Sequence, residues 1–152
     1  MPSTSQRQTI LDYLAETLFL TIDAGATYNH TVAKSARGLL SPEQLGVSDF
    51  PALFVANADE DRENVSNKDF MSIMHVFVVG YVKKNQTDLD IQQELDKLIY
   101  DVTVALYTDP TQGSRASWTE IKTINTDYGD DLEQASFVMQ VDFRYKNPGT
   151  TP

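Results

Sequence analysis

The residues from Phe70 to Val82 form a run of β-branched and aromatic side chains, which predicts a long strand. Successive side chains of a strand point to opposite faces, and both faces of this one are apolar. One face carries Met71, Ile73, His75, Phe77, Val79 and Tyr81, and the other carries Met74, Val76, Val78 and Val82. A single sheet can cover only one of these faces with its own helices.

The second face therefore needs a cover, because burying each such side chain is worth about 1.5–3 kcal/mol. The sequence is compatible with two ways of covering this second face. A partner molecule can supply one, which makes Met71, Ile73, His75, Phe77, Val79 and Tyr81 a candidate subunit interface. Alternatively, residues 25–50, which lack a clear pattern, fold back over it.

Two amphipathic helices are expected. The first covers residues 5–21, where Ile10, Leu11, Leu14, Leu18 and Ile22 form one stripe and Ser5 and Gln8 fit a capping box. The second runs from Thr87 to Thr108, begins with a capping box at Thr87 and Asp90, and ends before Asp109 and Pro110. Its apolar stripe comprises Ile91, Leu95, Leu98, Ile99, Val102, Ala105 and Leu106.

Three further strands are expected at Pro51–Ala56, Trp118–Asp127 and Glu133–Lys146. The charged residues from Asp59 to Asn64 read as a loop that projects into water. The fold class that follows is α+β, with an antiparallel β-sheet of four to five strands and two α-helices packed on one face. We expect a single domain over residues 1–152, with flexible ends at 1–4 and 147–152.

Composition and charge exclude several classes of function. With no cysteine among 152 residues, thiolate nucleophiles and Cys-ligated metal sites are ruled out. A net charge of −10 disfavours binding to a phosphate backbone, and the longest apolar run is too short for a membrane helix. The N-terminal residues lack the pattern of a signal peptide. No glycine-rich phosphate loop is present, so nucleotide binding is not expected.

The polar candidates for chemistry have structural interpretations. His75, within an apolar strand, is expected to be a buried, hydrogen-bonded structural histidine, and His30 has no partner at ligand spacing. The acidic groups around Asp59 and Asp130 do not match the ligand order of a calcium loop and read as solvated loops. A carboxylate-dependent hydrolase that requires a divalent metal stays open as an alternative from another class.

The order of these elements resembles the tail terminator proteins of long-tailed bacteriophages, also called tail-completion or tail-to-head joining proteins. The resemblance covers residues 5–146 and depends on order and spacing rather than on one phrase. The matching residues are Arg7, Ile10 and Leu14; the strand opening Pro51-Ala-Leu-Phe-Val; Gly80-Tyr81-Val82; Leu95, Leu98, Asp101-Val102 and Ala105-Leu106; Thr126-Asp127-Tyr128-Gly129; and an alternating strand that ends at Tyr145.

The resemblance implies a structural virion protein without enzymatic activity or cofactor. Such a protein forms a hexameric ring on the tail-tube protein, stops polymerisation of the tube and joins it to the connector of the head and neck. It is assembled in the host cytoplasm and located in the virion, at the head–tail junction. A head-completion or connector protein of the same neck region is the close alternative.

In that setting the acidity has two interpretations: it serves solubility alone, or it keeps DNA from adhering to the pore. The genome passes through the ring without specific binding, and a pore lined by carboxylates would repel its phosphates. The candidate channel or rim acids are Asp59, Glu60, Asp61, Glu63, Asp130, Asp131 and Glu133. The segments 25–49 and 57–69 are expected to contact neighbouring subunits or the tube.

Overall fold

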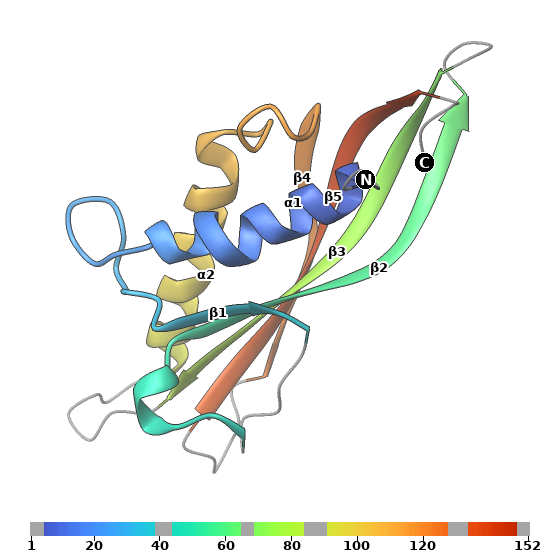
Figure 1. Cartoon of the computed structure of the whole chain (residues 1–152). Coiled ribbons are helices and arrows are strands. Elements are labelled where there is room, and N and C mark those ends of the chain that lie inside the picture. The colour runs from blue at the N-terminus through green and yellow to red at the C-terminus, as the bar shows by residue number, and fades with distance from the viewer. Residues whose placement is uncertain (1–4, 39–43, 65–68, 84–90, 128–133, 149–152) are drawn as a thin grey trace.

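The computed structural model describes residues 5–38, 44–64, 69–83, 91–127 and 134–148. Its main elements are helix α1 (Gln6–Tyr13), helix α2 (Ile91–Thr108), and strands β1 (Lys34–Arg37), β2 (Ala52–Asn64), β3 (Asp69–Lys83), β4 (Trp118–Asp127) and β5 (Gln134–Pro148). The strands form one sheet in the order β1-β2-β3-β5-β4, and both helices lie against one side of it (Figure 1). The fold is α+β, as predicted. None of the described helices combines the length and apolarity needed to cross a membrane.

The first helical segment has the predicted limits but changes its winding part-way. The Ser5 hydroxyl caps α1 by accepting from the Gln8 backbone N–H at 3.1 Å. A π-helical turn (Leu14–Leu18) and a 3₁₀ turn (Phe19–Thr21) then continue the helix. The wider π turn adds a residue to the step between inward positions, so Phe19 is buried and Leu18, which the stripe placed inside, is only half-buried.

Helix α2 presents the predicted stripe to the sheet. Leu95, Leu98, Val102, Ala105 and Leu106 are buried, and Ile91 and Ile99 pack at the margin. The helix ends at Thr108, as expected, and the Asp109 carboxylate then accepts from the backbone N–H groups of Thr111 and Gly113. The capping box predicted at Thr87 and Asp90 lies outside the described residues.

The sheet is mixed rather than purely antiparallel. Strand β1, which lies in the segment 25–50 that has no clear sequence pattern, pairs in parallel with the start of β2, with Lys34 opposite Ala52. The other three pairings are antiparallel. The chain returns to the same end of the sheet between Arg37 and Ala52, and this crossover makes the two strands run in the same direction.

Strand β2 overturns the prediction of a projecting charged loop. It continues through residues 59–64, and only a register shift between Asn57 and Glu60 interrupts its pairing with β3. The pairing allows these charges because they alternate between the faces: Asp61 and Glu63 lie on one face, and Glu60 and Arg62 on the other. Strand β5 likewise continues through Asn147 and Pro148, which had been assigned to a flexible end.

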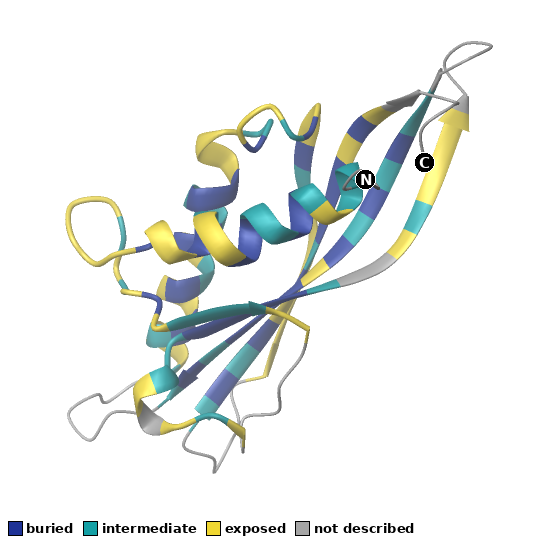
Figure 2. Cartoon of the chain, viewed as in Figure 1, coloured by how far each residue is buried: buried dark blue, intermediate teal, exposed yellow. Residues whose placement is uncertain are grey.

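The two faces of the sheet have different covers. The inner face, which carries Met74, Val76, Val78 and Val82 as predicted, is buried under the helices. On the outer face a small second cluster of Ala52, Phe54 and Val79 is packed by Leu45 from the segment before β2. The alternative that residues 25–50 fold back over this face is therefore correct for one end of it only. Phe77 and Val138 remain 36% and 37% exposed there. Figure 2 shows how buried and more exposed positions alternate along the strands of the sheet.

Candidate functional site

The outer face of β3 and β5 is the candidate docking surface, because it combines uncovered apolar side chains with charged ones. Of the six predicted interface residues, Phe77 is exposed and Val79 is buried by the chain itself. Met71, Ile73, His75 and Tyr81 are half-buried. Val79 is therefore removed from the candidate interface, and the residues from Met71 to Phe77 remain accessible to a partner.

His75 lies in the middle of this surface between two carboxylates. Its Nδ1 lies 2.6 Å from Oδ1 of Asp142 on β5, and its Nε2 lies 2.8 Å from Oδ2 of Asp61 on β2. Asp142 is buried to 8% side-chain exposure, whereas Asp61 is 73% exposed. Gln140 supports Asp142 by donating from Nε2 at 3.4 Å.

The protonated imidazole is the form that donates from both nitrogens at once. The hydrogen bond with Asp61, and next that with Asp142, raise the pKa of His75 above its usual value of 6.5. With both ring nitrogens occupied, His75 ties three strands together. This agrees with the structural interpretation of His75, although its side chain is partly exposed rather than buried.

Asp101 is a polar residue that analysis of the sequence did not single out as a site. It is fully buried on α2, where its carboxylate accepts from the backbone N–H groups of Asn29, at 2.9 and 3.1 Å, and His30, at 2.8 Å. His30, which had no partner at ligand spacing, lies with Nε2 3.2 Å from Oε2 of Glu94 on the same helix. The one signal in the sequence was an acid inside an otherwise apolar helical stripe.

A second polar group lies on the inner face, beneath the start of α1. Glu60 accepts from the Tyr145 hydroxyl and from Nε of Arg62 at 3.0 Å, and Nη1 of Arg7 lies 3.9 Å away. Burial, and next the hydrogen bond with Glu60, raise the pKa of Tyr145 to about 12. Glu60 therefore anchors β2 to the core.

These contacts revise the group of candidate channel acids. Glu60 faces inward and is paired, and Asp61 holds His75. Asp59 and Glu63 are exposed on β2. Asp130, Asp131 and Glu133 lie outside the described residues. The acids on β2 thus belong to a strand with two faces and do not form one solvated loop.

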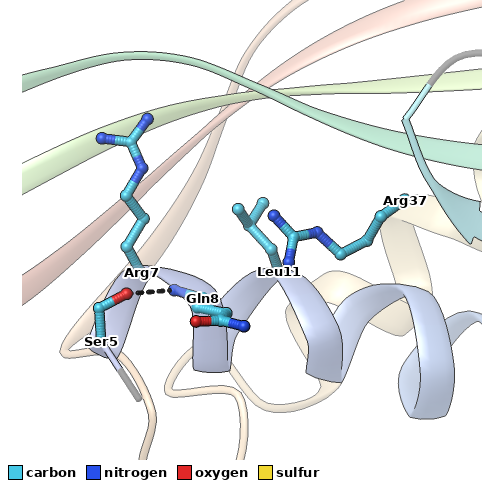
Figure 3. Close-up of a pocket in the computed structure, with 5 residues that line it drawn as sticks. All are labelled: Ser5, Arg7, Gln8, Leu11 and Arg37. Atoms are coloured by element: carbon cyan, nitrogen blue, oxygen red, sulfur yellow. Dashed lines mark hydrogen bonds between the residues drawn. The ribbon is translucent and has the colours of Figure 1, made fainter. Parts of the chain in front are cut away.

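A shallow pocket of about 280 Å³ opens beside α1 (Figure 3). Its lining includes two guanidinium groups, from Arg7 and Arg37, together with Ser5, Gln8 and Leu11. Each guanidinium has an acid nearby: Arg37 donates to Oδ1 of Asp12 at 2.9 Å, and Arg7 lies near Glu60. The pocket is therefore electrostatically compensated within the chain.

Within the described residues, no group of three or more histidine, aspartate or glutamate side chains is arranged to hold a metal ion. Comparison of the chain with protein-family models and with curated proteins finds no match.

Proposed function

We propose that this chain is a structural subunit of a homo-oligomeric ring that caps a phage tail tube, stops its polymerisation and presents a surface for joining to the head. The observation that carries the proposal is the incomplete cover of the outer sheet face. Phe77 and Val138, on neighbouring strands, stay more than a third exposed although the chain covers Val79, which lies opposite Val138 and two residues from Phe77.

The sheet edges support an assembly as well. Strand β4 ends the sheet on one side, and its residues from Lys122 to Asp127 are all exposed. Exposed edges present unpaired backbone groups, and a closed ring is one way to protect them. The resemblance in element order to tail terminators favours a ring on the end of a tail tube over other kinds of ring. In such a ring the role of the chain is mechanical rather than enzymatic.

The acidity fits passage of DNA through such a ring. A net charge of −10 on each copy would keep phosphates from adhering to the pore. Of the acids on β2, Glu60 and Asp61 hold partners within the fold, whereas Asp59 and Glu63 are exposed, so these two are the best candidates for the channel or its rim.

The proposal is tested by adding the purified chain to polymerising tail-tube protein and imaging the products by electron microscopy. A tube terminator gives shorter tubes with an extra ring at one end, in proportion to the amount added. Tubes of unchanged length with bare ends would contradict the proposal. A head-completion protein would leave tube length unchanged but bind heads.

A further inference from the structure

The ends of three strands form a projection that we name the distal arm: residues 60–64 of β2, 69–73 of β3 and 144–148 of β5. Its inner-face residues Glu60 and Tyr145 lie close to Arg7, at the start of α1. Figure 1 shows these ends extending together away from the helices. Among the described strands, β1 pairs with β2 only up to Val55, and β4 pairs with β5 only up to Arg144. The arm therefore has an open edge along residues 60–64 of β2 and, beyond the pairing of Arg144 with Trp118, along residues 145–148 of β5.

The strand register aligns charges of opposite sign on these two edges. Glu63 lies opposite Met71, which lies opposite Lys146; in the next row, Asp61 lies opposite Ile73, which lies opposite Arg144. All four charged residues are exposed and the two apolar ones are half-buried. The outer face of the arm is thus divided into an acidic column on β2, an apolar column on β3 and a basic column on β5.

Charges on an edge strand often keep copies of a protein apart. Like charges on both edges would serve that purpose, because neighbouring copies would repel each other at every edge contact. The arm has unlike charges instead, so the basic edge of one copy is complementary to the acidic edge of another.

We infer that the distal arms of successive copies associate head to tail, with the β5 edge of one copy beside the β2 edge of the next. Strands β2 and β5 both run antiparallel to β3, so they run in the same direction and the new pair is parallel. In the rows where the β5 edge is open, Lys146 then lies beside Glu63 of the next copy. This inference rests on the proposed function, for which it supplies the contact between subunits.

A contact between two different edges leaves a free edge at each end of the assembly until a ring closes. The charge columns also permit a second arrangement, in which two outer faces stack about a two-fold axis along β3 and acids again meet bases. That face-to-face arrangement stops at a dimer, so the number of copies in the assembly distinguishes it from the head-to-tail contact.

The test uses the absence of cysteine from the chain. Asn64→Cys and Asn147→Cys place one thiol on each edge in the row of Phe70 and leave the four charges intact. Within one copy these positions are two strands apart, about 10 Å, which is too far for a disulfide. Mild oxidation of the double variant should give a ladder of dimers, trimers and larger covalent species, whereas each single variant stops at the dimer.

Charge reversal supplies the matched control. Adding Glu63→Lys to the double-cysteine chain should lower the yield of species above the dimer by about tenfold, and adding Lys146→Glu as well should restore it. Glu16→Lys, the same change of charge on the exposed side of the π-helical turn Leu14–Leu18, should have no effect.

A product that stops at the dimer, or a ladder unaffected by Glu63→Lys, would overturn the inference. Annular wild-type particles that give no ladder would leave the proposed ring standing and remove only this contact. A ladder from a chain that does not stop tube growth would support the contact between the arms and remove the proposed role as a tube terminator.

Discussion

Nδ1 of His75 and Oδ1 of Asp142 lie 2.6 Å apart across the β3–β5 pair, in one strand row. A contact this short between an imidazole and a carboxylate is typical of a charge-assisted hydrogen bond. Because Asp61 holds the other nitrogen, the protonated ring connects β2, β3 and β5 just where the distal arm begins. His75 therefore links the three strands at the base of the arm.

Replacement of His75 by glutamine should remove one pH-dependent contribution to stability. The folded pKa is raised above 6.5, so this contribution is complete below pH 6.5 and is lost as pH rises through the folded value. The free energy of unfolding of the wild-type chain should exceed that of His75→Gln by about 1 kcal/mol below pH 6.5, and the difference should shrink above that pH. Urea unfolding of both chains across this range measures the difference. A constant difference between them would contradict the assignment.

Removal of the buried carboxylate of Asp101 should destabilise the fold strongly. In Asp101→Ala, the backbone N–H groups of Asn29 and His30 lose their acceptor, so we expect a loss of about 2–4 kcal/mol in the free energy of unfolding. Asp96→Ala, an exposed acid on the same helix, is the matched control and should change stability by less than about 0.5 kcal/mol. Equal effects of the two changes would show that Asp101 does not hold this loop.

The absence of a side chain at Gly80 makes room for the ring of Phe137. The two residues are opposite each other on β3 and β5, and a Cβ at Gly80 would overlap that ring. Gly80→Ala should therefore cost about 1–3 kcal/mol, and Phe137→Leu in the same chain should recover part of the loss. Gly46→Ala, where the added Cβ meets only an ordinary contact with Asp49, is the control. Simple additivity of Gly80→Ala and Phe137→Leu would contradict this account.

Phe77 should contribute more to assembly than to folding. Because its side chain is 36% exposed in the single chain, Phe77→Ser should lower the free energy of unfolding by only about 1 kcal/mol and yet impair ring formation. Tyr100→Ser, on the exposed side of α2, removes an aromatic ring from elsewhere on the surface and should leave assembly intact. Thermal unfolding and light scattering on the same samples separate the two effects. Unimpaired assembly of Phe77→Ser would remove Phe77 from the interface.

Local patterns predicted the elements whose limits are set locally. The stripe in α2, the cap at Ser5 and the alternation in β5 follow from nearby residues, and each is present in the structure. The extension of β2 through Asp61 could not be predicted in this way, because it depends on pairing with β3 and on partners such as His75 and Tyr145. Long-range pairing there overrides the preference of a charged segment for a loop.

The candidate site was predicted in outline only. The apolar pattern of β3 identified the outer face and left its cover open between a partner and residues 25–50. Leu45, from that segment, covers one end of the face, and which end it covers could not be predicted. The role of Asp101 was hidden because its partners, Asn29 and His30, lie about seventy residues away in the sequence. A polar residue in an apolar stripe shows that a partner exists without showing where it is.

The central claim, that copies of this chain complete one another's surface in a ring, is tested most directly by the molar mass and shape of the purified chain, alone and with tail-tube protein. Light scattering should give a fixed multiple of 17.0 kDa, and electron microscopy of the same fraction should show annular particles, either free or on tube ends. A 17.0 kDa species that persists at the highest soluble concentration, and that forms no annuli when tubes are present, would contradict the claim.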